Sequence, residues 1–339
     1  MLELDGGDGG GQLFRSALTL SALTTTDFEM ENIRGSRPEP GLKPQHLTAL
    51  QTVADITNAS VEGAEVGEST ITFEPAEPTG GHYEAAIGTA GSVTLLFDAV
   101  LPIASALDRP LSLTATGGTS VAWSPSMPWY RRVKLPLLRR SALQAAVDVE
   151  RTGLYPAGGG QATLSLAPST PSALHLRDRG QPERARIHST ATTDLADSDV
   201  AERQAKQACQ RLAASDVDIE VTERATRYVS ADSTGTVALV VLAYENGVIG
   251  ADALGEPGKP AEDVADDAVD AALTAHETGA AVDGHLADQL IPWLATVGGE
   301  VRIPRVTDHV ETHVDLFDAF GFDVRIGRTD DGTVLLGEP

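Results

Sequence analysis

Two histidines, His309 and His313, lie four residues apart in a segment whose pattern predicts a helix from His309 to Phe320. Side chains at this spacing share one helix face. A histidine with a pKa near neutrality can act as a nucleophile or carry a proton, and a pair could also bind zinc. The chain has no HExxH motif and no obvious third zinc ligand. Because a lone helical histidine is more often structural, this segment alone leaves both roles open.

A second segment, residues 283–290, places His285 and Asp288 three positions apart on one face of a predicted helix. Such a pair could bind a metal ion or contact the adenine or ribose of a nucleotide. Considered alone, a capped helix with a solvated face is the simpler interpretation of this segment.

A glycine-rich loop, residues 5–12, leads from a predicted strand into a predicted helix. Glycine allows close backbone approach to a ligand, and a helix N-terminus presents free N–H groups to an anion. The loop therefore suits a phosphate group, which Arg15 could also reach. It is neither a GxxxxGK[ST] nor a GxGxxG motif, because Gln12 stands at the last glycine position. A tight structural turn is an equally good interpretation.

Positive charge is concentrated in residues 33–46, where Arg34, Arg37 and Lys43 fall within ten positions. In a chain of net charge −24 such a concentration is unusual, and it suits a polyanionic ligand. The alternative is a surface loop whose cations pair with nearby acids.

Three aromatic side chains, Trp123, Trp129 and Tyr130, come shortly before Arg131 and Arg132. A nucleic-acid base could stack on these rings with help from the arginines. Packing of the rings beneath a loop is at least as good an interpretation.

Alternating strands and helices must position these segments. Glycine-rich loops precede at least three of the predicted helices, which indicates a repeated α/β unit whose copies have diverged too far for a fixed period. Predicted strands include 30–33, 69–73, 111–116 and 162–166, and predicted helices include 12–23, 44–56, 93–107 and 127–138.

The middle of the chain, from about residue 176 to 275, is rich in charged residues and alanine and has its own strand–helix–strand–strand order. We expect an inserted subdomain here, with the first architecture resuming near Gly279. The elements predicted in this part and after it are a helix over 197–214, strands over 217–222 and 236–243, a helix from Pro260, and strands over 296–303 and 323–326.

Composition narrows the class of protein. The chain has 25 basic and 49 acidic residues, which excludes a generally basic nucleic-acid binder. Only four of the basic residues are lysines, and many carboxylates with few lysines are typical of a protein hydrated in concentrated salt. We therefore predict a halophile's protein, and a merely acidic mesophilic protein is the alternative.

Cys209 is the only cysteine, so neither an intrachain disulfide nor a thiolate metal cluster can form. The first residues carry no basic region followed by an apolar stretch, and no apolar run is long enough to span a bilayer. We expect a soluble, cytoplasmic protein.

Taken together, eight segments resemble the RNA 3′-terminal phosphate cyclase family, and the resemblance extends from Leu4 to about Arg325. Each segment is a weak signal alone, but eight in the right order are a strong one. The segments are LDGGDGGGQLFRSALTLS, IRGSRPEPGLKPQHL, IGTAGSVTLLFDAVLP, GGTSVAWSP, GLYPAGGG, LGEPGKPAE, VDGHLADQL and HVETHVDLFDAFG.

The resemblance implies that a histidine attacks ATP, forms a covalent histidine–AMP and releases pyrophosphate. AMP then moves to the 3′-phosphate of an RNA end. The neighbouring 2′-hydroxyl attacks the activated phosphorus, expels AMP and leaves a 2′,3′-cyclic phosphate. The resemblance also implies a divalent metal, Mg²⁺ or Mn²⁺, as well as ATP. Activation is needed because a bare phosphate lacks a good leaving group.

The resemblance places the nucleophile at His309. Separately, the density of positive charge near the glycine loop leads us to expect that Arg34, Arg37 and Lys43 hold the RNA end. The resemblance further implies nucleotide binding by Asp8, Arg15, Gln45, Asp98, His285, Leu286, Ala287, Asp288 and Gln289, and metal binding by Asp8 as well.

Four positions depart from the family pattern. Asp8 replaces the usual Glu and has a shorter side chain, which puts its role near the metal or ATP in doubt. Asp98 stands where many members have Gln, and because an acid beside ATP phosphates is unfavourable, we expect it to face the ribose or adenine. Ser120 replaces a common Asp, and His313 replaces the usual Asn. None of these changes removes the nucleophile.

The fold implied by the resemblance is α/β (α+β): a large domain of repeated α/β units resembling enolpyruvyl transferases, with a small inserted thioredoxin-like α/β domain. We predict the large domain over 1–178 and 276–339 and the inserted domain over 179–275. Two other functions remain open. Non-catalytic relatives that act in ribosome assembly or RNA binding lack the histidine, and enolpyruvyl transfer shares only the architecture.

Overall fold

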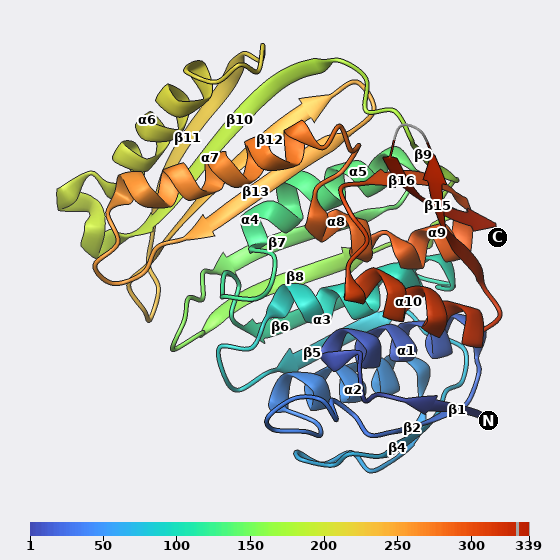
Figure 1. Cartoon of the computed structure of the whole chain (residues 1–339). Helices are drawn as coiled ribbons and strands as arrows, with labels where there is room; N and C mark the ends of the chain where they lie inside the picture. The colour runs from blue at the N-terminus through green and yellow to red at the C-terminus, as the bar shows by residue number, and fades with distance from the viewer. Residues whose placement is uncertain (330–331, 339) are drawn as a thin grey trace.

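The computed structural model describes residues 1–329 and 332–338. Three four-stranded sheets in it share one topology, in which a β-α-β-α-β-β unit gives the strand order first-second-fourth-third. In each sheet the first two strands are parallel and the remaining pairings are antiparallel. The fold is therefore mixed α/β and built from repeated units, which confirms the predicted architecture (Figure 1).

The first unit contains the glycine-rich loop and the arginine-rich loop. Helix α2 (Pro44–Thr57) starts with a proline and is followed by Asn58, whose left-handed backbone accommodates the turn into the next strand. The elements of this unit are β1 (Leu2–Asp5), α1 (Gly10–Thr24), β2 (Phe28–Glu31), α2 (Pro44–Thr57), β3 (Ser60–Glu62) and β4 (Ile71–Glu74).

The second unit has the clearest alternation of buried and partly exposed residues, along β6, as expected for a strand with one face on a core. Its second helical connection is interrupted by a π-helical turn, η2, which presents a run of basic residues. The elements are β5 (Gly81–Ala86), α3 (Val93–Val100), the 3₁₀ turn η1 (Leu101–Ser105), β6 (Leu111–Gly117), α4 (Met127–Trp129), η2 (Tyr130–Lys134), α5 (Leu135–Arg140), β7 (Ala145–Arg151) and β8 (Gly160–Leu166).

The third unit is split by the insertion, which follows its first strand. Helix α8 begins at a true cap, since the Asp283 side chain accepts hydrogen bonds from the backbone N–H groups of His285 and Leu286. The elements are β9 (Leu174–Leu176), α8 (Gly284–Gln289), α9 (Ile291–Val297), β14 (Gly299–Ile303), α10 (Asp308–Ala319), β15 (Asp323–Thr329) and β16 (Gly332–Glu338).

The inserted unit forms a fourth sheet of order β11-β10-β12-β13, and helices α6 and α7 pack against each other over it (Figure 1). Strand β12 is buried along its whole length because alternate side chains enter two different cores. The elements are β10 (Pro182–Thr192), η3 (Thr193–Ser198), α6 (Val200–Ala213), β11 (Val221–Val229), β12 (Thr236–Tyr244), β13 (Val248–Leu254) and α7 (Ala261–Glu277).

Several predicted strands have other bounds in the structure. The strands predicted over 30–33 and 69–73 are Phe28–Glu31 and Ile71–Glu74. The strand predicted over 217–222 begins only at Val221 and continues to Val229. The strand predicted over 296–303 begins at Gly299, because Thr296 and Val297 still belong to helix α9 (Ile291–Val297). β-Branched residues favour a strand locally, but the tertiary packing of this helix prevails.

Helices from all three repeated units meet at the centre, where α1 packs against α3 and α10 (Figure 1). A single apolar core runs through these units, and the helices of the inserted unit cover a separate one. None of the helices described is both long and apolar enough to cross a membrane.

Candidate active site

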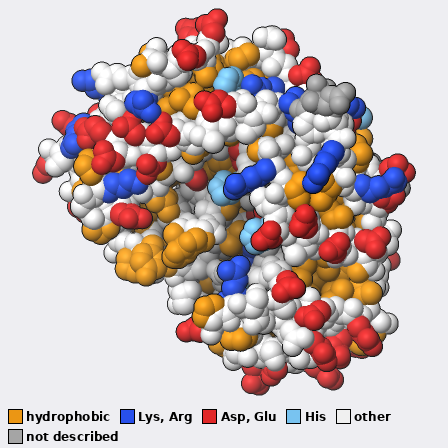
Figure 2. Space-filling view, viewed as in Figure 1, with side chains coloured by type: hydrophobic (Ala, Val, Ile, Leu, Met, Phe, Trp, Pro, Cys, Tyr) orange, Lys and Arg blue, Asp and Glu red, His pale blue; other side chains and the backbone are white. Residues whose placement is uncertain are grey.

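A cavity of about 680 Å³ opens where the helices of the three units meet. Figure 2 shows histidine, lysine and arginine side chains around a hollow in this face, while carboxylates dominate the periphery. Most of the residues predicted from the sequence line this one cavity, which we call the central cleft: Arg15, Arg34, Arg37, Lys43, Gln45, Asp98, His285, Asp288, Gln289 and His309.

His309 lies in the first turn of α10 with its side chain exposed at the cleft. Thr307 caps this helix by accepting a hydrogen bond from the backbone N–H of Val310. One turn further, His313 is buried, and its Nε2 lies 2.9 Å from Oγ of Ser16 on α1. The two histidines thus share a face, as the spacing predicts, but only His309 is free to meet a ligand.

Burial lowers the pKa of His313 to about 3, and the neighbouring His309 and Arg15 act in the same direction. The ring is therefore neutral near pH 7, which leaves the Ser16 contact as a bond between neutral groups. This contact joins α10 to α1 and so fixes the helix that carries His309.

Lys134, from η2, is the basic residue at the floor of the cleft that the sequence did not single out. Its Nζ lies 2.5 Å from a carboxylate oxygen of Asp98 and donates a 2.8 Å hydrogen bond to Oε1 of Gln289. The side chains of Lys134 and Asp98 are only 3% and 15% exposed, so the pair is removed from most solvent screening. Asp98, an acid expected to be unfavourable beside ATP phosphates, therefore has the cation Lys134 next to it.

Arg15 stands between two carboxylates. Burial lowers its pKa to about 10, while Asp98 and Asp288 oppose that shift, so the guanidinium stays charged near neutrality. Asp288 accepts a 3.0 Å hydrogen bond from Nε2 of Gln12, and burial raises its pKa. These contacts tie the start of α1 to α8.

The arginine-rich loop supplies three cations with different surroundings. Arg34 donates from Nη1 to the carbonyl oxygens of Glu39 and Gly41, both at 2.8 Å, and so braces the loop itself. Lys43 forms an ion pair with the exposed carboxylate of Glu39. In the part of the chain that the structure describes, the guanidinium of Arg37 has neither a hydrogen bond nor an ion pair, which leaves it available to an anion.

The glycine-rich loop brings this cationic loop close to the start of α1. A Cβ built on Gly11 would lie 2.1 Å from Nε2 of His46, and one built on Gly10 would lie 3.1 Å from Nη2 of Arg37. Gly10 also has a φ of +59°, which disfavours any side chain. Close packing of backbone against these rings and cations requires glycine at both positions.

Helix α8 is held from the inserted unit. The buried carboxylate of Asp283 caps α8 and also accepts a 3.0 Å hydrogen bond from the backbone N–H of Gly250 on β13. The exposed ring of His285 packs edge-on against Trp129, with ring centroids 5.9 Å apart. The predicted cap is thus present, but the face bearing His285 and Asp288 lines the cleft and is not simply solvated.

Three predicted nucleotide-binding residues lie outside the cleft lining. Asp8 is exposed in a separate depression beside Thr312 and Asp315, so the structure does not bring it to the other candidates. Leu286 and Ala287 are buried in the core beneath α8, as apolar side chains in that helix must be.

The three aromatic side chains predicted as a stacking surface also differ in exposure. Trp129 and Tyr130 are completely buried, which rules out their rings as stacking surfaces, whereas Trp123 is 96% exposed at the edge of the cleft. Among the described residues, no three His, Cys, Asp or Glu side chains form a cluster that could hold a metal ion. Nε2 of His313 is engaged by Ser16, so the structure lends no support to a zinc site shared by His309 and His313.

Comparison with known proteins matches residues 6–326 to the family model described as RNA 3′-terminal phosphate cyclase. The chain belongs to this family. It is 47% identical over 348 residues to the RNA 3′-terminal phosphate cyclase of Halobacterium salinarum, with 99% of each chain covered. It is 37% identical to that of Pyrococcus furiosus, with 98% of each covered, and 38% identical to that of Ectopseudomonas mendocina, covering 94% of this chain and 92% of the relative.

A solved structure, the enolpyruvyl transferase NikO from Streptomyces tendae, is 12% identical with a TM-score of 0.28, covering 50% of this chain and 33% of that one. Membership of the cyclase family confirms the family predicted from the eight segments.

Several cleft residues were not predicted from the sequence: Gln12, Ser16, His46, Lys134 and Trp293. Of these, Lys134 had a usable signal, because it is one of only four lysines.

Proposed function

We propose that this protein converts the 3′-terminal phosphate of RNA to a 2′,3′-cyclic phosphodiester at the expense of ATP, with His309 as the nucleophile. Membership of the RNA 3′-terminal phosphate cyclase family supports the overall reaction. The observation that carries the assignment of the site is the convergence of an exposed His309 with Arg15, Lys134 and Arg37 in one cleft.

In the first step, a ring nitrogen of His309 attacks the α-phosphorus of ATP. A P–N bond forms, the bond between the α-phosphorus and the bridging oxygen breaks, and pyrophosphate leaves with the electron pair. Arg15 is charged near neutrality and lies at the same cleft, where it would balance charge that develops on the phosphoryl oxygens. Lys134 is already paired with Asp98 and would contribute less net charge.

In the second step, an oxygen of the RNA 3′-phosphate attacks the phosphorus of the histidine-bound AMP, and the histidine leaves. In the third, the 2′-oxygen attacks the RNA phosphorus, its proton is lost, and AMP departs with the bridging oxygen. No redox partner is needed. His313 holds α10 against Ser16, which would keep His309 in place through all three steps.

A divalent ion, Mg²⁺ or Mn²⁺, would neutralise charge on the phosphates of ATP. Mg²⁺ commonly binds through substrate phosphates and only one or two carboxylates, and Asp288 is a carboxylate of the cleft next to His285 and His309. Asp8, the metal ligand suggested by the sequence, faces a different depression, and we leave it out of the proposed site.

The test is incubation with ATP labelled at the α-phosphate, followed by measurement of protein-bound label and of cyclic RNA ends. Wild type should become labelled, and the label should be released by acid and retained in alkali, as expected for a phosphoramidate. His309→Ala should lose label and cyclisation together. His82→Ala, which removes an exposed histidine outside the cleft, is the matched control and should retain both.

Two results would contradict the proposal. Label retained in His309→Ala would remove that residue from the role of nucleophile and direct attention to His285 or His313. Absence of label from the wild type, with RNA binding intact, would favour a non-catalytic RNA-binding relative.

A further inference from the structure

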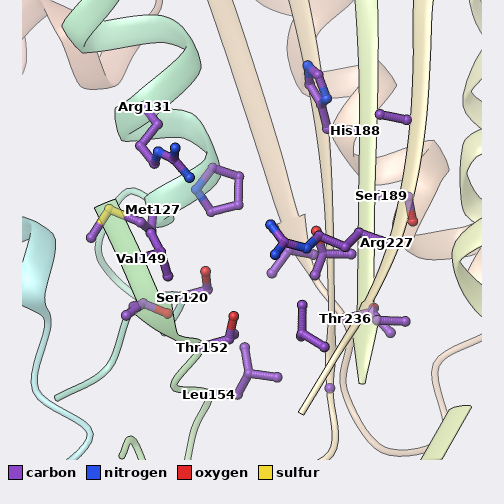
Figure 3. Close-up of a pocket in the computed structure, with 18 of the residues that line it drawn as sticks. Ser120, Met127, Arg131, Val149, Thr152, Leu154, His188, Ser189, Arg227 and Thr236 are labelled. Carbon is purple, nitrogen blue, oxygen red and sulfur yellow. The ribbon is translucent and has the colours of Figure 1, made fainter. Parts of the chain in front are cut away.

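A second cavity, of about 210 Å³, lies between η2 of the second unit and the sheet of the inserted unit. Figure 3 shows Arg131 and Arg227 reaching toward it from opposite walls, with His188 above them. Among the residues that the structure describes, no carboxylate side chain lines this cavity, although the chain has 49 acidic residues. We call it the junction pocket.

The alternation of side chains along β10 and β11 explains why positive charge collects on the side of the junction pocket formed by the inserted sheet. Successive side chains of a strand point to opposite faces, so Arg186, His188 and Thr190 of β10 share one face. His188 is paired in register with Ala225, and Thr190 with Arg227, which puts Arg227 of β11 on that same face. Arg131 and Arg132 approach it from η2.

These cations are not satisfied within the protein. Across residues 1–329 and 332–338, the guanidinium groups of Arg131, Arg132 and Arg227 form neither hydrogen bonds nor ion pairs. His188 is only 6% exposed, yet both of its ring nitrogens lack a hydrogen-bond partner, as does Nε of Arg186. Buried polar atoms in native proteins nearly always have partners, so these atoms are available to hydrogen-bond a ligand that enters the pocket.

The carboxylate of Glu223 lies near this pocket. Glu223 Oε1 is 3.7 Å from Nδ1 of His188, but its side chain is half exposed. Burial and the charge of Arg131 lower the pKa of Arg132, and Glu223 only partly opposes this. Burial together with Arg132 and Arg186 lowers the pKa of His188 to about 3. The cations therefore repel one another, and a bound anion would relieve that repulsion.

We propose that the junction pocket binds a backbone phosphate of the RNA strand, upstream of the 3′ end held in the central cleft. This inference rests on the proposed function for the identity of the strand. Arginine suits the ligand because its planar guanidinium donates two parallel hydrogen bonds to phosphate oxygens. The hydroxyl groups of Ser120, Thr152 and Thr190 line the same pocket and can donate further bonds.

The two sites share one wall, which favours a strand over a free anion. Within η2, Arg131 and Arg132 line the junction pocket, whereas Lys134 lines the central cleft. The loop before α4 is divided likewise, with Ser120 in the pocket and Trp123 in the cleft. Trp123 is 96% exposed, so its ring offers a stacking face to a base of a strand that runs from one site to the other.

The experiment compares two 3′-phosphorylated RNAs, a dinucleotide and an octanucleotide, by fluorescence anisotropy between 0.5 and 2 M KCl. The variant is the double substitution Arg131→Gln and Arg227→Gln. The control is Arg203→Gln, which removes an exposed arginine paired with Glu262 on the far side of the inserted sheet. Thermal unfolding of each variant shows whether the junction remains folded, and Arg227→Lys provides a charge-preserving variant.

We expect the double variant to bind the octanucleotide about tenfold more weakly, while dinucleotide affinity and self-labelling by ATP stay unchanged. The slope of log affinity against log salt should become shallower by about 0.7, as for one lost single-strand phosphate contact. Arg227→Lys should lose less affinity than the double variant.

Three results would overturn the inference. One is an equal loss of affinity for both RNAs, and another is no loss for either. The third is calorimetric binding of inorganic phosphate that the double variant abolishes while octanucleotide affinity is retained, which would make the pocket a site for a free anion. A wild type that binds RNA but takes no label from ATP would contradict the proposed function and leave this comparison valid.

Discussion

Nζ of Lys134 lies 2.5 Å from a carboxylate oxygen of Asp98, and both side chains are largely buried at the floor of the central cleft. The pair joins η2 to α3, and through Gln289 it also joins α8. It therefore holds elements of two repeated units around the site. If the cleft binds phosphate as proposed, an acid at position 98 can be accommodated there because Lys134 is paired with it.

Removing one member of such a pair leaves a buried charge without compensation. We predict that Lys134→Met lowers the free energy of unfolding by about 3 kcal/mol, whereas Lys134→Met combined with Asp98→Leu restores most of the loss. Chemical denaturation measures both. Lys206→Met, at an exposed lysine, is the control and should change stability little. A single variant as stable as the wild type would show that the pair contributes nothing to the fold.

The arginine-rich loop gives a second prediction. Arg37→Ala should weaken binding of a 3′-phosphorylated RNA more than it weakens self-labelling by ATP, because its guanidinium is available to a ligand. Arg34→Ala should impair both, since Arg34 braces the loop through the carbonyl oxygens of Glu39 and Gly41. RNA affinity and label per protein are the two readouts. Equal losses in Arg37→Ala would place this loop at the nucleotide instead.

Backbone packing at the start of α1 gives a third. A Cβ on Gly11 would fall 2.1 Å from Nε2 of His46, so Gly11→Ala must displace a buried ring. We expect a loss of about 1–3 kcal/mol in stability, together with lower ATP labelling. Gly284→Ala is the matched control, because a Cβ there meets no atom within 4 Å. If the two variants behave alike in unfolding and labelling, the contact with His46 has no consequence.

The sequence was sufficient to predict the repeated units, since each glycine-rich loop before a helix is a local signal. It also predicted ten of the residues that line the central cleft, and the resemblance supplied scattered positions such as Arg15, Gln45 and His309. Local patterns could not indicate which face a side chain would take. Trp129 and Tyr130 resemble a stacking surface in sequence and are buried in the structure, whereas Trp123 beside them is exposed.

Contacts between distant segments were beyond the sequence altogether. Ser16 and His313 are 297 positions apart, and Lys134 and Gln289 are 155 apart. Neither pair has a motif of its own, because the partners come together only when helices of different units pack. Asp8 illustrates the reverse case, since the glycine-rich loop that carries it was predicted, but the loop turns its carboxylate away from the cleft.

Buried histidines make stability depend on pH. Burial lowers the pKa values of His46, His188 and His313 to about 3 each, whereas the unfolded chain binds a proton at each near pH 6.5. Because the folded values are depressed, the unfolded state takes up more protons as the pH falls below 6.5. The contribution of these three histidines to the free energy of unfolding is therefore fully present above pH 6.5. It is lost as the pH falls toward 3, by up to about 4 kcal/mol per pH unit for the three groups together.

The measurement is the free energy of unfolding at pH 7.5, 6.5 and 5.5 in constant salt. His313→Asn removes one titrating ring and keeps a side chain that can bond to Ser16, so its pH slope should be about one third shallower. Burial raises the pKa values of Asp283 and Asp288, which opposes the trend at lower pH and sets the lower limit of the window. A wild-type slope of zero below pH 6.5 would contradict the prediction.

The last prediction concerns salt. The net charge of −24 is spread over a surface on which Figure 2 shows carboxylates at the periphery. Some of these carboxylates are paired, as Glu262 is with Arg203 and Asp270 with Arg211 between α7 and α6, but the acidic residues outnumber the basic ones almost two to one.

The Debye length grows from about 3 Å at 1 M salt to about 30 Å at 0.01 M, so at low salt the repulsion between carboxylates acts across whole units. We therefore expect a melting temperature several degrees higher in 2 M than in 0.1 M KCl, because screened repulsion outweighs the few screened ion pairs. RNA affinity should change in the opposite direction, since salt weakens contacts between arginine and phosphate. Sucrose at matched water activity is the control that separates charge screening from general exclusion of solutes. A melting temperature that is highest in 0.1 M KCl would show that the acidity of this chain has another cause than adaptation to salt.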